Sequence, residues 1–192
     1  MPGRLDDLVQ AAMGLAVSEI ERYGLPSQIH FDLSVKEGRR IATHLGARVD
    51  LVEVGIALMD VKLGQAFSEK RLADHVTMSE ETAKEFLSHS DLSDEERRIV
   101  LNSVAAHHGT VPFASLEAEI CANADCYRFI HPRGVLSYMT VVARRTDDFH
   151  ACLEQVEAKL DEKRRIVSLP LVRQELLPVY EVLKSYIALA RG

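Results

Sequence analysis

The chain has 192 residues, and its 47% hydrophobic and 27% charged residues are typical of a globular protein of one domain. A net charge of −6, from 23 Lys and Arg against 29 Asp and Glu, does not attract a long nucleic acid. Aromatic residues make up only 6% and Trp is absent, which argues against a stacking platform for single strands. A small phosphorylated molecule needs only one local cluster of positive charge, so it stays an expected partner.

The N-terminal residues, the lack of long apolar runs and the cysteines indicate the cellular compartment. The N-terminal residues MPGRLDDLVQ contain acids and no long apolar run, so we expect no signal peptide. No stretch approaches the ~18–20 apolar residues of a membrane-spanning helix. Cys121, Cys126 and Cys152 are odd in number and lack zinc-type spacing, so we expect reduced, buried core residues. Together these features predict a cytoplasmic protein that does not contact a membrane.

Apolar residues recur with helical spacing along the chain, and no run alternates convincingly with the period of a strand. Residues 4–23 place their apolar side chains on one stripe and predict a first helix, which Gly24 ends. Asp32 is expected to cap a second helix that runs to about Leu45. Residues 50–63 are apolar almost all round, which predicts a helix through the centre of the fold.

The second half of the chain predicts further helices separated by short turns. The polar segment 64–76 is expected to be a loop or a short turn. Capping boxes open helices at Thr77, with Glu80, and at Ser93, with Glu96. Pro178 is expected to kink or divide the last helix. The predicted helices span about residues 77–88, 93–108, 115–130, 135–144, 147–166 and 169–190.

These elements predict an all-α fold. Residues 1–145, with the helix at 4–23 included, are expected to form a helical core. Residues 146–192 are expected to form a C-terminal helical extension. That extension would pack on the core or on a second subunit, and the second arrangement would make the protein a homodimer.

Two carboxylates lie in apolar segments that are expected to be buried, where a charged group is energetically unfavourable. Asp60 in ALMDVKLG and Asp125 in ICANADCYRF are surrounded by apolar residues, and helical spacing directs both toward the core. Burying an unpaired carboxylate costs several kcal/mol or more, so such a group is normally neutralised, paired or bound to metal. Imidazoles and carboxylates that converge on one pocket form a divalent-metal site.

The histidines divide into two groups. The adjacent pair His107 and His108 follows a buried stripe and comes out at the core-facing end of its helix. His30 and His75 each precede a predicted helix start, from which an imidazole can reach a cleft. The remaining histidines lie near helix ends or among polar residues and are expected to have no special role: His44, His89, His131 and His150.

The order of these residues resembles the HD-domain superfamily of metal-dependent phosphohydrolases over roughly residues 25–145. His30 precedes GRRIA at 38–42, in the register of the family's histidine before A-x-x-I-A. The segment LVEVGIALMDVKLG is similar to the helix that ends in the family's His-Asp doublet. Three later motifs of the family also have similar segments here: His75 in DHVTMSEETAKEFL, VAAHHGT and AEICANAD.

The resemblance implies an HD-like helical bundle that hydrolyses a phosphoester such as a nucleotide, with one or two divalent ions bound. The ion would be Mn, Fe, Mg, Ni or Zn, which the sequence does not distinguish. Asp60 would be the catalytic group that bridges metals or orients the attacking water. Substrate phosphate would contact Arg128, Arg133 and Lys62, although the competing interpretation of both arginines is a solvated surface. The implied metal ligands are His30, Asp60, His75, His107, His108 and Asp125.

Met59 stands where the doublet has its histidine. A thioether is a soft, weak donor that suits Mg, Mn or Fe(II) poorly, so the change Met59→His is expected to raise metal affinity. Lys62 lies one place nearer than the family's usual lysine. Met59 favours an alternative function, a degenerate HD domain that binds a nucleotide or a protein partner without turnover and without metal. A structural helical adaptor is a third interpretation.

Overall fold

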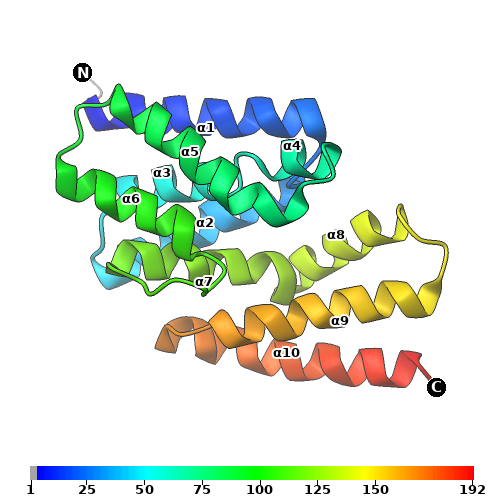
Figure 1. The fold of residues 1–192 in the computed structure, drawn as a ribbon. Helices are drawn as coiled ribbons and strands as arrows, with labels where there is room; N and C mark the ends of the chain where they lie inside the picture. Colours follow the sequence, from blue (N-terminus) through cyan, green and yellow to red (C-terminus); the bar gives the residue numbers. More distant parts are fainter. Residues whose placement is uncertain (1–3) are drawn as a thin grey trace.

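A computed structural model describes residues 4–192, which form an all-α fold with no strand in that range (Figure 1). The all-α prediction is confirmed. None of the helices in these residues combines the length and apolar character needed to span a membrane. The helices are α1 (Arg4–Tyr23), α2 (Gln28–Leu45), α3 (Val49–Met59), α4 (Leu63–Ser68), η1 (Leu72–Asp74), α5 (His75–Ser88), α6 (Asp94–Ala106), α7 (Leu116–Ile130), α8 (Pro132–Ala143), α9 (Phe149–Ile166) and α10 (Pro170–Ala190).

Helix α3 lies at the centre, in contact with α1, α2, α5, α6 and α7. Every residue from Leu51 to Met59 is buried, as expected for a helix that is apolar all round. A Cβ on Gly55 would lie 2.9 Å from Ser103 Cβ, so only glycine lets α6 pack this closely. The helix ends at Met59 rather than continuing to residue 63, and Asp60 stands in the turn that follows.

Two helices begin earlier than the sequence indicated. Ser27, not Asp32, caps α2, because its Oγ accepts a hydrogen bond from the backbone N–H of His30. No side chain caps α5, which begins at His75 and contradicts the predicted box at Thr77. Segment 64–76 also holds more structure than a loop, since it contains most of α4 and all of η1.

Other predicted boundaries are confirmed. Gly46 ends α2 in the left-handed conformation at φ 68°. Ser93 and Glu96 form the capping box of α6, and Ser115 caps α7. Helix α10 continues past Pro178 without a break, so this proline does not divide it.

The C-terminal helices α9 and α10 pack on α7 of the same chain, beside one another (Figure 1). Leu160 of α9 and Leu176 of α10 join one buried cluster with Ile120 and Ile130 of α7. A second cluster unites α1, α3, α5 and α6. Because α7 lies between α2 and α9, its core face is covered on both sides, and side chains from α9 reach the same interior as those from α3.

Candidate metal centre

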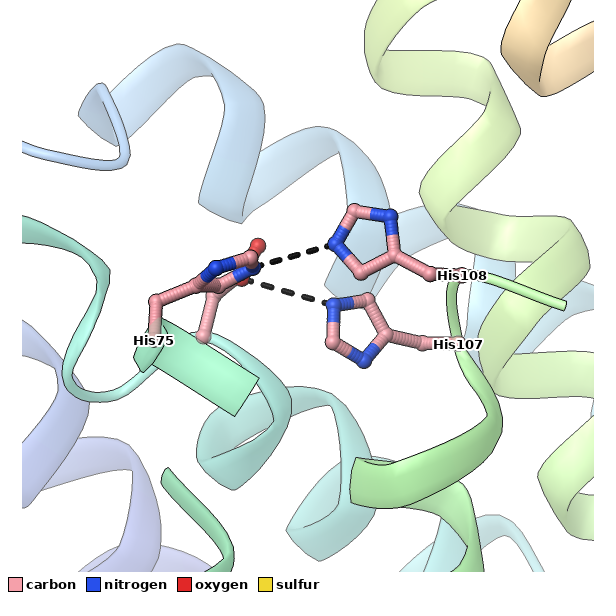
Figure 2. A group of neighbouring side chains, drawn as sticks. His75, His107 and His108 are labelled. Atoms are coloured by element: carbon pink, nitrogen blue, oxygen red, sulfur yellow. Dashed lines mark hydrogen bonds and ion pairs between the residues drawn. The ribbon is translucent and has the colours of Figure 1, made fainter. Parts of the chain in front are cut away.

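Four side chains converge beside the central helix: Asp60, His75, His107 and His108. One ligand atom from each lies within 4.8 Å of the others. Asp60 comes from the turn after α3, His75 is the first residue of α5, and the two adjacent histidines follow α6. Figure 2 shows the imidazole of His75 facing those of His107 and His108 across a small gap.

Each of the three imidazoles is held by its Nδ1. A carbonyl oxygen can only accept a hydrogen bond, so Nδ1 carries the proton in the neutral rings of His75 and His107. This assignment follows from the hydrogen-bond network and leaves a bare lone pair on Nε2 of both rings. His108 Nδ1 faces both an acceptor, Glu162 Oε1, and a donor, Lys163 Nζ at 3.4 Å. The acceptors are the Leu72 carbonyl for His75 at 2.7 Å, the Val104 carbonyl for His107 at 2.7 Å, and Glu162 Oε1 for His108 at 3.1 Å.

The three Nε2 atoms and one oxygen of Asp60 face one another. His75 Nε2 lies 3.0 Å from His108 Nε2, and Asp60 Oδ1 lies 3.5 Å from His107 Nε2 and 3.7 Å from His75 Nε2. Asp60 Oδ1 and His107 Nε2 are buried and have no hydrogen-bond partner. Buried acceptors without a donor are costly, and a cation at the centre of this cluster could satisfy these two.

The donor set fits a divalent metal ion. Imidazole nitrogens and a carboxylate are ligands that Zn, Fe, Ni and Mn accept. The Nδ1 contacts also fit, because metal-binding histidines commonly donate their second ring N–H to a carbonyl or a carboxylate. Three imidazoles and one carboxylate oxygen therefore form a cluster that could hold a divalent metal ion.

Electrostatics keep the carboxylate charged. Burial alone would raise the pKa of Asp60, but the Arg128 guanidinium holds it well below its ordinary value. Burial lowers the pKa of His108 despite its contact with Glu162. Asp60 is therefore ionised and the His108 ring is neutral at physiological pH, which are the forms that bind a metal.

Asp125 lies nearby but has other partners. Its Oδ1 accepts a hydrogen bond from Arg128 Nη1 at 2.8 Å, and its Oδ2 pairs with Lys163 Nζ at 2.6 Å. The same Arg128 nitrogen also reaches Asp60 Oδ2 at 2.5 Å. All four side chains are buried. Asp125 therefore does not join the group of converging ligand atoms.

His30 is buried and also stands apart from that group. Its Nε2 lies 2.9 Å from the Gly134 carbonyl, to which a neutral ring donates, and the ring packs against Phe129 and Tyr138. A Cβ on Gly134 would lie 2.4 Å from the Arg128 carbonyl, so this close junction of α7 and α8 needs glycine. Burial, helped by the charge of Arg128, lowers the pKa of His30 to about 4.

A cavity of about 160 Å³ opens beside these groups. His30, Asp60, His75, His108 and Asp125 all contribute to its lining, so most of the predicted ligands reach one cavity. Its remaining walls are largely apolar and include Leu25, Pro26, Phe67, Phe129, Tyr138 and Val141. Four cations complete the lining: Arg128, Arg145, Lys159 and Lys163.

Two of the three predicted phosphate contacts lie elsewhere. Arg133 is exposed, and Lys62 pairs with Glu19 at 3.2 Å, and neither lines the cavity. Arg128 does line it, but its guanidinium is bound to two carboxylates. Met59 packs in the hydrophobic cluster that joins α2, α3 and α7 to the C-terminal helices, and it does not line the cavity. The gain expected from Met59→His stays a prediction.

The sequence reasoning missed the contribution of α9. Lys163 is 1% exposed and continues the buried stripe of Leu153, Val156 and Leu160 at helical spacing. A lysine in register with a buried stripe is a signal that could have been found, because a buried lysine requires an anionic partner.

The chain matches no known protein-family model, and no solved structure matches it significantly. The HD-domain resemblance therefore stays an expectation carried by the residues quoted above.

Proposed function

We propose that this protein is a metal-dependent phosphohydrolase that acts on a small phosphoester such as a nucleotide. One observation carries the proposal: Asp60 and three imidazoles bring their ligand atoms within 4.8 Å of one another beside a cavity that also holds cations. Two of these atoms, Asp60 Oδ1 and His107 Nε2, are buried without a hydrogen-bond partner. Such a set is poised to bind a divalent ion, and the neighbouring cations favour an anionic substrate.

Lys159 and Arg145 are the cations best placed to bind the substrate. Lys159 pairs with the half-buried Glu162 at 2.7 Å. Arg145 is exposed, lies over the Phe67 ring at 4.2 Å, and has no ion-pair partner among residues 4–192. Neither cation contacts Asp60 or Asp125, so each can form charge-assisted hydrogen bonds to a phosphate. They take the role first expected of Arg133 and Lys62.

In the proposed hydrolysis, the bound ion and the surrounding side chains would have different roles. A bound divalent ion polarises a phosphoryl group and lowers the pKa of its water. Asp60, ionised and with Oδ1 facing the imidazoles, would help to hold that ion. Glu162 contacts Nδ1 of His108 and orients its ring, and the apolar cavity walls keep bulk water from the reacting phosphate.

The alternative function, a nucleotide- or protein-binding module without turnover, has one specific observation in its favour. Arg128 and Lys163 already neutralise Asp125, and Arg128 also bonds to Asp60. A cavity with fixed cations binds an anion even where no reaction follows.

Metal content and turnover together test the proposal. The full chain would be assayed for bound metal as purified, titrated with Mn(II), and offered p-nitrophenyl phosphate and nucleoside monophosphates. Asp60→Asn is the test variant, and Asp32→Asn, on the outer surface of α2, is the control. Metal binding with turnover that Asp60→Asn abolishes supports the hydrolase. Metal or nucleotide binding without turnover supports the binding module, and failure to bind any divalent ion contradicts the hydrolase.

A further inference from the structure

A buried network of two acids and two cations adjoins the candidate metal centre. Asp60 and Asp125 are 8% and 1% exposed, and Arg128 and Lys163 are 3% and 1% exposed. One Arg128 nitrogen, Nη1, lies 2.5 Å from Asp60 Oδ2 and 2.8 Å from Asp125 Oδ1. Lys163 Nζ lies 2.6 Å from the other oxygen of Asp125.

Arg128 Nη1 lies between the carboxylates of Asp60 and Asp125, in the position that a cation bound by both would occupy. Asp125 directs each of its oxygens to a protein cation, and Asp60 directs one, so three of the four carboxylate oxygens are engaged. The charges balance, with two acids against one arginine and one lysine. The remaining oxygen, Asp60 Oδ1, is the one that faces the imidazoles.

The two cations are fixed in place. Both Arg128 and Lys163 lie over the ring of Phe129, with centroid distances of 5.4 Å, so the network has an apolar cover. Moving either cation out of this interior would leave a buried carboxylate without its partner, which is strongly unfavourable. A metal ion that approached Asp125 would have to displace at least one of them.

We propose that Arg128 and Lys163 act as a built-in substitute for a metal ion between Asp60 and Asp125. The centre then binds a single divalent ion, through Asp60 Oδ1 and the three imidazoles, and Asp125 is not a ligand. Arg128 is a positioning residue, because it holds Asp60 with Oδ1 toward the imidazoles. This inference rests on the proposed metal-dependent function.

The number of bound ions tests the inference on the full chain. Mn(II) would be counted by native mass spectrometry and calorimetry, and electron paramagnetic resonance would distinguish an isolated ion from a coupled pair. The wild-type protein is expected to bind one isolated ion. Arg128→Met, which removes the charge, is expected to unfold at lower temperature in EDTA, to regain stability with Mn(II), and to bind a coupled pair.

Two controls accompany that variant. Arg128→Lys keeps the charge and is expected to bind one ion. Arg40→Met removes an arginine that also bridges two acids, Glu37 and Glu175, but outside the cavity, so Mn(II) is not expected to restore its stability.

A second variant keeps the test decisive if Arg128→Met fails to fold. Asp125→Asn is expected to lose less than ~100-fold in Mn(II) affinity, the range of an indirect partner. A larger loss would mean that Asp125 binds the ion directly and would overturn the inference. Two ions in the wild-type protein, or one ion without rescue in Arg128→Met, would overturn it while leaving the metal-dependent function intact. A wild-type protein that binds no ion would overturn both.

Discussion

His107 has no exposed surface, and its Nδ1 is held by a carbonyl three residues earlier in the chain. Its Nε2 therefore has to find a partner inside the protein. We expect His107→Ala to reduce Mn(II) affinity by more than the ~10–100-fold that a change to an indirect partner costs. Titration calorimetry measures this, with His44→Ala, an exposed histidine at the end of α2, as the control. Equal affinity in His107→Ala and the wild-type protein would show that the imidazole is not a ligand.

Arg145 and its neighbour Arg144 form a matched pair of exposed arginines, of which only Arg145 lines the cavity. If Arg145 binds the phosphate of the substrate, Arg145→Ala raises KM with little change in kcat, because it removes binding common to substrate and transition state. Steady-state kinetics on a phosphoester substrate check this. Arg144→Ala should leave both constants unchanged, and similar effects in the two variants would point to general surface charge instead.

His30 makes stability depend on pH in mildly acidic solution. The unfolded chain binds a proton at this residue below about pH 6.5, whereas the buried ring in the folded state resists protonation until about pH 4. Its contribution is fully present above pH 6.5 and is lost as the pH falls toward 4. At about 1.4 kcal/mol for each tenfold change in proton affinity, the loss approaches about 3 kcal/mol. Urea unfolding from pH 4.5 to 7 should show a flatter profile for His30→Gln, and parallel profiles would refute this assignment.

At the scale of the element, only one of the two predicted capping boxes starts a helix. Ser93 makes the capping box of α6, while Thr77 lies exposed inside α5. We expect Ser93→Ala to lower the free energy of unfolding by about 1 kcal/mol and Thr77→Ala to change it by less than about 0.5 kcal/mol. Chemical denaturation measures both. A comparable loss from Thr77→Ala would mean that the helix begins at the sequence motif after all.

These caps also show how far local sequence determines the elements. Helix type and the central place of α3 follow from hydrophobic spacing, which is a local property. The starts of α2 and α5 do not, because an equally good local motif stood a few residues later in each case. The approach of His75, His107 and His108 could be predicted from their helix ends. The pairing of Asp125 with Lys163 could not, since only the folding of α9 onto α7 brings residues so distant in sequence together.

At the scale of the whole molecule, the predicted boundary after residue 145 lies between parts of the chain that contact one another in the structure. Helices α9 and α10 complete the cluster around α7, and α9 supplies Glu162, Lys159 and Lys163 to the cavity region. A chain of residues 1–145 should therefore lose cooperative thermal unfolding, because the apolar face of α7 is left exposed and Asp125 loses a partner. Circular dichroism during a thermal scan tests this. A sharp transition near that of the full chain would show that residues 1–145 fold independently.

The position of α9 after the candidate ligands in the sequence also orders events during synthesis on the ribosome. Asp60 and the three imidazoles have all been made long before Glu162 and Lys163 leave the exit tunnel. Until then, His108 has no carboxylate to fix its ring and Asp125 lacks its lysine. A nascent or prematurely terminated chain thus carries every proposed metal ligand without the contacts that orient them. Synthesis of α9, rather than the appearance of the ligands, is the step that completes the candidate centre.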